Sequence, residues 1–244
     1  MITFSRRGAM LLASAFVALA PAAARAQAPA APPAAAAPQT YEGPAHVIFY
    51  VEAKAGAVDK TIALLKRYRA ALRKDAAIRG TQLIQELGRP NRLALIASWS
   101  DQPAFEAHEK GPVMTALRKD LESLAIAPPD RRLHHDFLVG SLKPPPKGAI
   151  FALVHIDVNP PNRVATDAIL KQLVADSRKD SGNLGYDVWW QNLTNLNHYG
   201  SVSIWRDRKA FESYERQSHT EAARKAVQPL LGALWDERLY RILD

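Results

Sequence analysis

The sequence predicts an α+β fold built from two copies of one βαββαβ unit, packed sheet to sheet as a barrel within one chain. One observation is an internal repeat, in which Trp99, Asp101 and Ala104-Phe105-Glu106 recur with the same spacing as Trp205, Asp207 and Ala210-Phe211-Glu212. The other is that strand and helix periodicities follow in the same order in each copy. Two copies of about 95 residues indicate a duplicated domain rather than a solenoid.

The first copy opens with residues 45–52, which alternate between an apolar and a more polar face, as a strand does. A helix is expected next, because apolar side chains recur at spacings of three and four, and it should have ended by Gly80. Gly88 and Pro90 predict a hairpin turn, and Pro112 breaks the later helical region in two. The expected elements are strands 45–52, 81–86, 92–99 and 133–139, and helices 58–72, 102–110 and 113–124.

The second copy repeats this order with one inserted residue. Its broken helix should restart at Ser218, where Ser218 and Glu221 have the spacing of a capping box. The expected strands are 150–158, 186–191, 198–205 and 235–243.

The order βαββαβ is the ferredoxin-like arrangement, whose antiparallel sheet carries helices on one face and leaves the other bare. Two such copies can cover each other's bare sheets, which forms a barrel with helices outside. The expected division is a signal peptide at 1–26, a Pro/Ala-rich linker at 27–43, a first repeat at 44–140, a Pro-rich linker at 141–147 and a second repeat at 148–244.

The N-terminus has the pattern of an export signal. Arg6 and Arg7 precede a short apolar run, and Ala24-Arg25-Ala26 forms a small-residue cleavage site. We therefore expect an exported protein, in the bacterial periplasm, that uses either the general secretory or the twin-arginine route. No other stretch approaches ~20 apolar residues, so no stable membrane insertion is expected after cleavage.

Composition excludes several classes of chemistry. The chain has no cysteine, which removes disulfides, a thiol nucleophile and sulfur ligands for a metal. The formal charge of +8 falls to +5 without the three arginines of the first 26 residues, and the remaining cations alternate with acids. This pattern favours solvated helix faces over nucleic-acid binding. His134 and His135 are adjacent and should point to opposite faces of a strand, so we expect no metal site.

The motif of a strand-end Trp, then Asp, then Ala-Phe-Glu-Ala-His resembles the antibiotic biosynthesis monooxygenase domain of the dimeric α+β barrel superfamily, here in tandem. The resemblance covers residues 44–140 and 148–244. It implies oxidation of a quinol-like or phenolic small molecule by O₂ with no metal or flavin cofactor, and hence a small apolar or aromatic substrate. It also implies a pseudo-dimer within one chain, with further homo-oligomerisation open.

The same resemblance indicates candidate catalytic residues. Trp99 and Trp205 match the family's strand-end Trp, and His108 matches the His of the motif. The other two are His219, which matches a frequent second His, and Asn91, which lies eight residues before Trp99. The two copies should be chemically unequal, because Tyr214 stands where the first copy has His108.

Further residues are candidates for substrate binding: Tyr50, His155, Tyr199, Tyr214 and Asn197. Tyr50 and His155 are equivalent in the two copies and should meet near the barrel interior. They could form a hydrogen-bonded seam, or His155 could act with nearby Asp157 as an acid–base pair. Tyr199 shares a strand face with Ser201 and Ser203, which could form a polar pocket wall or part of a core.

Two other functions remain open at this point. The duplicated barrel could be a non-catalytic exported protein that binds a small molecule or serves in stress, or it could bind or degrade haem through one histidine.

Overall fold

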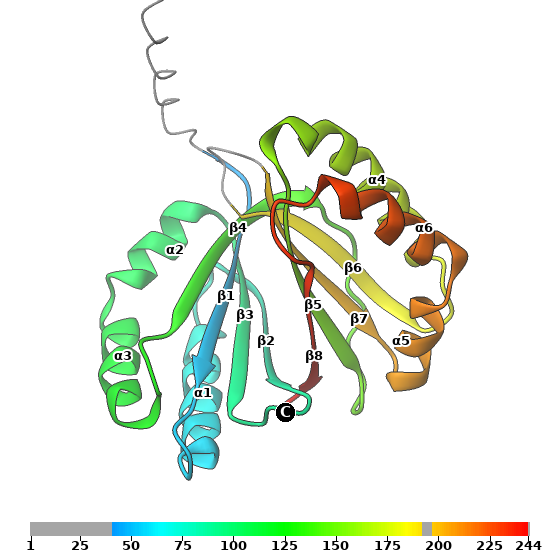
Figure 1. The fold of residues 1–244 in the computed structure, drawn as a ribbon. Coiled ribbons are helices and arrows are strands. Elements are labelled where there is room, and N and C mark those ends of the chain that lie inside the picture. The colour runs from blue at the N-terminus through cyan, green and yellow to red at the C-terminus, as the bar shows by residue number, and fades with distance from the viewer. Residues whose placement is uncertain (1–40, 192–196, 244) are drawn as a thin grey trace, which may run out of the picture. The chain divides into compact units, whose positions relative to one another are not determined.

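The computed structural model describes residues 41–191 and 197–243, so the expected signal peptide and most of the first linker lie outside the described residues. Figure 1 shows the chain in element order. The first copy comprises β1 (Ala45–Glu52), α1 (Val58–Leu72), β2 (Ile78–Glu86), β3 (Arg92–Trp99), α2 (Gln102–Glu109), α3 (Pro112–Leu124) and β4 (Asp130–Leu138). The second comprises β5 (Ile150–Asp157), η1 (Pro160–Asn162), α4 (Arg163–Ser177), β6 (Asn183–Trp190), β7 (His198–Trp205), α5 (Arg208–Glu215), α6 (Ser218–Val227), η2 (Gln228–Leu230) and β8 (Asp236–Ile242).

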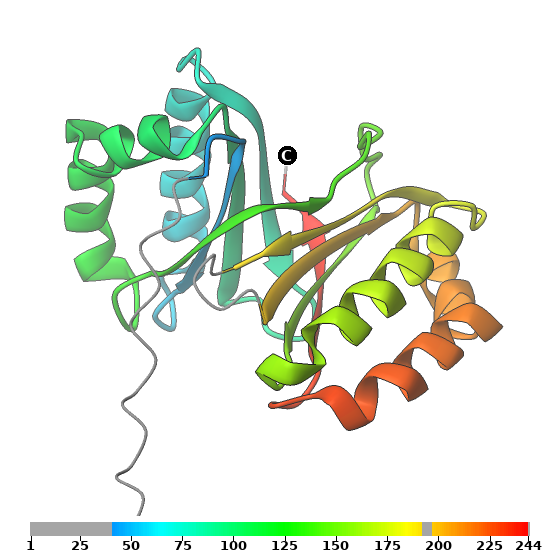
Figure 2. The ribbon, with the colours of Figure 1, turned by 90° about the horizontal axis from the view of Figure 1, so that it is seen from above.

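The eight strands close into one antiparallel barrel, in the order β1-β3-β2-β8-β5-β7-β6-β4. Each copy supplies four consecutive strands of this ring, and the copies join where β2 pairs with β8 and β4 pairs with β6. The helices of the two copies lie outside the barrel on opposite sides (Figure 2). The structure confirms the predicted α+β fold of two ferredoxin-like repeats that share one barrel.

Strand alternation separates the core into layers. On β1, Val47 and Phe49 pack against the helices of the first copy, whereas Ile48 faces the barrel interior. The second copy has its own helix-side core, which includes Trp205 and Tyr214. The two helix-side cores lie on opposite outer faces of the barrel, so a site between a sheet and its helices is built mainly by one copy, although Phe137 of the first copy packs on the second core and Leu243 of the second copy packs on the first.

The second strand of each copy is longer than the sequence indicates. Helix α1 ends at Leu72, and β2 begins at Ile78 rather than near residue 81, so Gly80 lies inside the strand and does not end the helix. The pairing of β2 with β3 shifts register between Ile78 and Gly80, and β6 shows the same shift between Asn183 and Gly185. A glycine beside such a bulge masks the strand pattern in the sequence.

The helix caps differ from the expected pattern. Helix α6 begins at Ser218 as predicted, but its N-cap is Gln217 and no side chain caps it. The expected capping box is therefore absent. An aspartate that recurs in both copies caps α2 and α5 instead. The Ala104 N–H donates to Asp101 and the Ala210 N–H donates to Asp207, both at 2.8 Å.

In the part of the chain that the structure describes, none of the helices has the length and apolar character needed to cross a membrane.

Candidate functional site

Trp99 and His108 come together between the first sheet and its helices. Trp99 ends β3 and is 1% exposed, and its ring centroid lies 4.8 Å from that of half-buried His108 on α2. Tyr68, on the inner face of α1, places its hydroxyl 2.7 Å from Nε2 of His108. Helix α1 thus joins β3 and α2, which follow each other in the sequence, in one aromatic and polar cluster.

Burial sets the protonation state of this cluster. Burial lowers the pKa of His108, which favours the neutral imidazole, while nearby Asp75 and Glu109 act in the opposite direction. Burial raises the pKa of Tyr68 well above its ordinary value. In the tautomer that carries its proton on Nδ1, His108 accepts the hydrogen bond from the Tyr68 O–H at Nε2. A neutral imidazole whose Nε2 accepts a phenol is a base positioned for a phenolic proton.

The space beside this cluster is small. A cavity of about 20 Å³ lies against Tyr68, Trp99 and His108, which is about enough for one water. A groove of about 510 Å³, called here the first groove, adjoins it and shares Phe49, Glu109 and Arg131 with its lining. Glu109 accepts from Arg131 and from Arg118. This ion-paired cluster borders both the cavity and the first groove.

The second copy fills the equivalent position with aromatic rings. Tyr214 stacks on Trp205 at 4.4 Å between centroids, and its hydroxyl lies 3.4 Å from that of Tyr186. Leu173 takes the place of Tyr68 and packs in the same core. Burial raises the pKa of Tyr214 well above its usual value, so this phenol is a poor base. His219 lies beside this stack rather than in it. Its Nε2 is 3.1 Å from Asp180 Oδ2, and its ring centroid is 6.4 Å from that of Tyr214.

The charges beside the two clusters are inverted between the copies. In the second copy Arg224 bonds Glu215 and Glu237, each at 2.6 Å, so one cation lies between two acids. In the first copy one acid, Glu109, lies between two arginines. The cluster at Arg224 thus has an excess of acids and the cluster at Glu109 an excess of cations, while the charged residues that line the groove of about 680 Å³ near Arg224 are Arg224 and Lys225.

The two candidate asparagines lie away from the tryptophans. Asn91 precedes β3 and donates to Glu52, so the length of the strand, roughly 25 Å, separates it from Trp99. Asn197 donates to the Val158 carbonyl at the corresponding end of β7. The structure does not bring either asparagine together with a tryptophan of its copy.

Tyr199 belongs to a core rather than to an open wall. It is fully buried on the helix side of β7 and donates to Asp167 of α4 at 2.7 Å. Ser203 accepts from the Trp205 indole N–H at 3.0 Å. The polar face of β7 is therefore occupied by internal packing and hydrogen bonds.

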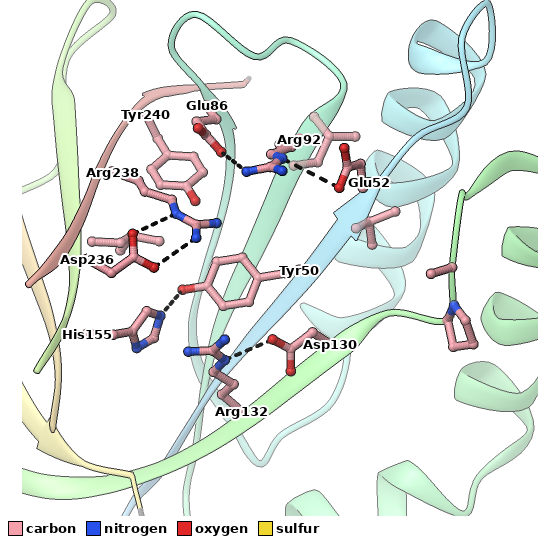
Figure 3. Close-up of a pocket in the computed structure, with 15 residues that line it drawn as sticks. Tyr50, Glu52, Glu86, Arg92, Asp130, Arg132, His155, Asp236, Arg238 and Tyr240 are labelled. Atoms are coloured by element: carbon pink, nitrogen blue, oxygen red, sulfur yellow. Dashed lines mark hydrogen bonds and ion pairs between the residues drawn. The ribbon is translucent and has the colours of Figure 1, made fainter. Parts of the chain in front are cut away.

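Tyr50 and His155 meet at one end of the barrel, as expected from their equivalence in the repeat. The Tyr50 hydroxyl lies 2.8 Å from Nε2 of His155 (Figure 3). The structure therefore has the hydrogen-bonded seam, and the alternative pair of His155 with Asp157 is not formed, since Asp157 bonds Nδ1 of His198 at 2.7 Å. Burial lowers the pKa of His155 to about 4, with Arg132 acting in the same direction.

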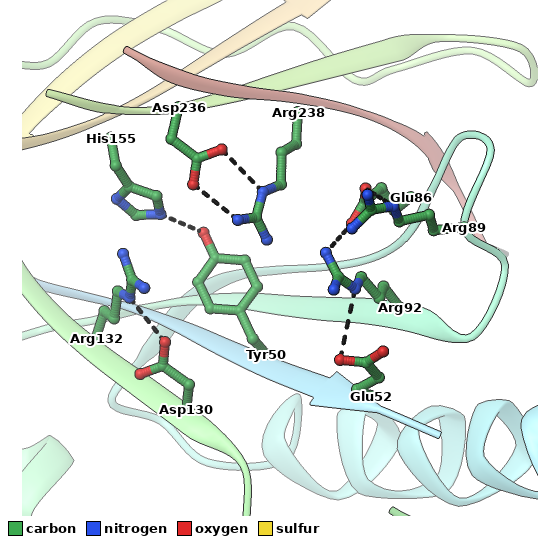
Figure 4. Close-up of polar contacts among 10 residues, drawn as sticks. All are labelled: Tyr50, Glu52, Glu86, Arg89, Arg92, Asp130, Arg132, His155, Asp236 and Arg238. Atoms are coloured by element: carbon green, nitrogen blue, oxygen red, sulfur yellow. Dashed lines mark hydrogen bonds and ion pairs between the residues drawn. The ribbon is translucent and has the colours of Figure 1, made fainter. Parts of the chain in front are cut away.

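Two matching ion pairs flank this contact. Arg132 bonds Asp130 at 2.9 Å, and Arg238 bonds Asp236 at 2.8 and 3.0 Å from equivalent positions on β4 and β8 (Figure 4). Sequence reasoning missed these four residues. The signal was available, because the strings Asp-Arg-Arg-Leu and Asp-Glu-Arg-Leu open the last strand of each copy.

The histidines of β4 lie on opposite faces. His134 is fully buried inside the barrel, 6.4 Å between ring centroids from His155, whereas His135 contacts Tyr41. Among the described residues, no group of three His, Cys, Asp or Glu side chains has the arrangement of a metal site.

The shared barrel and the outer helices define a tandem protein of the dimeric α+β barrel class. The family model for antibiotic biosynthesis monooxygenase matches residues 44–120 and 149–226, once in each copy. The chain belongs to this family, and both repeats are members of it. A comparison with curated proteins found no match.

Solved structures share the fold at low sequence identity. A provisionally named monooxygenase from Fusobacterium nucleatum aligns with a TM-score of 0.70 and 13% identity, over 84% of this chain and 94% of that one. A second protein so named, from Lactobacillus acidophilus, gives 0.64 and 13% over 83% and 100%. An anthrone oxidase-like protein gives 0.61 and 12% over 84% and 92%.

Proposed function

We propose that the first copy oxidises a quinol-like or phenolic small molecule with O₂, and that it needs no cofactor. The observation that carries this proposal is the contact of the Tyr68 hydroxyl with Nε2 of a neutral, half-buried His108 against Trp99. Family membership supports the reaction class. The second copy, with Tyr214 and Leu173 in the matching positions, serves as structural support for the barrel.

The role of His108 is to take the phenolic proton. A substrate hydroxyl donates to Nε2, either directly in place of Tyr68 or through the Tyr68 oxygen, and leaves an electron-rich phenolate. For a hydroquinone, O₂ accepts electrons from this anion, one oxygen atom enters the ring and the other leaves as water. The product is a hydroxyquinone, and the proton on His108 is released in the formation of water.

Entry of a ring requires the cavity to join the first groove. About 20 Å³ cannot hold an aromatic ring, whereas a cavity of ~150 Å³ accommodates benzene. The Arg131 side chain is 43% exposed, so few buried contacts are lost when it moves away from Glu109. We infer that the substrate enters from the first groove and separates these two side chains.

The direct test is O₂ consumption with a series of hydroquinones. His108→Ala should lower kcat by about 10²-fold, the magnitude expected for loss of a general base. His219→Ala is the matched control, because it removes a histidine from the second copy and should leave the rate unchanged. Equal rates in wild type, both single variants and the double variant would contradict the assignment.

The small cavity favours one alternative function. If the cluster at Trp99 stays closed, the protein is a non-catalytic binding barrel, and wild type will consume no O₂ above background with any phenol. We also propose that the protein acts after export to the periplasm, which a search for its mature form in that fraction would test.

A further inference from the structure

A pocket of about 280 Å³ opens at the end of the barrel where Tyr50 and His155 meet, and we call it the mouth pocket. Both copies line it, through strands β1 to β5 and β8 (Figure 3). It lies on the barrel side of the sheet, whereas Trp99 and His108 lie on the helix side. It is therefore separate from the site of the proposed oxidation.

The mouth pocket holds guanidinium groups with unused donors. Arg132 makes its side-chain hydrogen bond within the described chain through Nε, to Asp130, which leaves its two terminal nitrogens for a ligand. Arg92 lies 3.5 Å from Glu52 and 3.8 Å from Glu86, distances too long for good hydrogen bonds. A ligand with acceptor oxygens could take up these donors of Arg132 and Arg92.

The pocket also holds an acceptor without a donor. Oε2 of Glu86 is buried, and its ion pair with Arg92 Nη1 at 3.8 Å is too long for a hydrogen bond, so it has no hydrogen-bond partner among the described residues. A buried carboxylate oxygen without a donor is costly, and a ligand hydroxyl could satisfy it. The ligand therefore carries acceptor oxygens at one end and a hydrogen-bond donor at the other.

Charge and shape narrow the class of ligand. The lining contains three arginines and four carboxylates, and each arginine is already paired with an acid, so a phosphate dianion would be repelled. A monovalent carboxylate can still form a fork with one guanidinium. Leu153 and Tyr240 supply apolar walls suited to a ring, and the volume exceeds the ~150 Å³ that accommodates benzene.

We propose that the mouth pocket binds a single-ring hydroxycarboxylate. Its carboxylate accepts from the terminal nitrogens of Arg132, its ring lies against the apolar wall, and its hydroxyl donates to Glu86 beside Arg92. Binding at this place bridges the two copies, because Arg132 comes from the first and the wall residues Leu153 and Tyr240 from the second.

Titration calorimetry of the full-length exported protein with 4-hydroxybenzoate tests the proposal. Saturable binding with a dissociation constant below ~1 mM is expected, with benzoate about tenfold weaker and phenol weaker still. Arg132→Gln should weaken 4-hydroxybenzoate at least tenfold. Arg208→Gln is the matched control, because it removes a guanidinium that pairs with Glu212 on α5 and does not line the mouth pocket, and it should leave the affinity unchanged.

A second variant makes the result independent of Arg132. Glu86→Gln should reduce the preference for 4-hydroxybenzoate over benzoate while the affinity for benzoate stays within about twofold. Circular dichroism establishes that each variant is folded. The proposal is overturned by absence of saturable binding to wild type, by equal losses in Arg208→Gln and Arg132→Gln, or by an unchanged preference in Glu86→Gln.

Discussion

The hydroxyl of Tyr68 lies 2.7 Å from Nε2 of His108, and the equivalent positions in the second copy hold Leu173 and Tyr214. Duplication has therefore left one copy with an imidazole base against its tryptophan and the other with a stacked phenol. The strands and α-helices of the two copies match in order, so the asymmetry at these positions comes from the side chains, while the second copy differs in backbone by the short helices η1 and η2.

Removing the Tyr68 hydroxyl should alter the rate of proton transfer much more than the stability of the fold. Tyr68→Phe frees Nε2 of His108 from its donor. We expect the rate of hydroquinone oxidation to change by about tenfold, upward if the substrate replaces Tyr68 at Nε2 and downward if the proton passes through the Tyr68 oxygen. The free energy of unfolding should fall by only about 1 kcal/mol. Stopped-flow O₂ consumption and thermal unfolding measure the two quantities. Tyr186→Phe, which removes a hydroxyl from the second copy, should leave the rate unaltered; a similar rate change in both variants would rule out a specific role for Tyr68.

The interior histidines should make the protein sensitive to acid. Burial lowers the pKa of His134 to about 3 and that of His155 to about 4, against ~6.5 in the unfolded chain. Between pH ~6.5 and ~4 the unfolded chain binds more protons, so the free energy of unfolding falls as the pH falls, by up to about 1.4 kcal/mol per pH unit for each histidine. Asp187 opposes this, since burial raises its pKa to about 6 and its native carboxyl retains a proton in part of the same range.

Variants isolate the two histidine contributions. His155→Gln keeps an acceptor for Tyr50, and His134→Leu removes two ring nitrogens that have no partner among the described residues. Each should flatten the decline in urea-unfolding free energy between pH 7 and pH 4.5 relative to wild type. His198→Gln, on a half-exposed residue, is the control. Parallel pH curves for wild type and both interior variants would refute this origin of the acid sensitivity.

The repeated aspartates should stabilise equivalent helices by similar amounts. Asp101→Ala and Asp207→Ala each remove an N-cap bond of 2.8 Å, so each should lower the midpoint of chemical unfolding, and by a similar amount. Asp101→Ser and Asp207→Ser keep an acceptor and should recover most of this loss. A serine variant as unstable as its alanine counterpart would argue against capping.

One chain should suffice for the barrel, and neither half should be stable alone. Residues 41–140 and 148–243, expressed separately, would expose the strand edges now paired as β2 with β8 and β4 with β6, along with the interior core. We expect insoluble or self-associating halves that reassociate when mixed, as size-exclusion chromatography would reveal. Two stable, independent monomers would contradict the shared barrel.

Much of the architecture follows from local sequence patterns. The repeated Trp and Asp define the duplication, strand alternation places Val47 toward helices and Ile48 inward, and the repeat alignment brings Tyr50 to His155. These features follow from the spacing of apolar residues and from the alignment of the two repeats, and both can be obtained from a single sequence. The ends of β2 and β6 escape this reasoning, because a bulge beside Gly80 or Gly185 interrupts the pattern.

The composition of the sites was decided by tertiary structure. Periodicity assigns Tyr68 to the inner stripe of a helix, but the packing of α1 against α2 determines that its hydroxyl meets His108, forty positions away. In the same way, strand register gives Asp157 to His198 rather than to His155, and the length of β3 separates Asn91 from Trp99. The sequence by itself determined which face each side chain occupies; the partner that it meets there depends on register and helix packing, which arise only when all elements assemble.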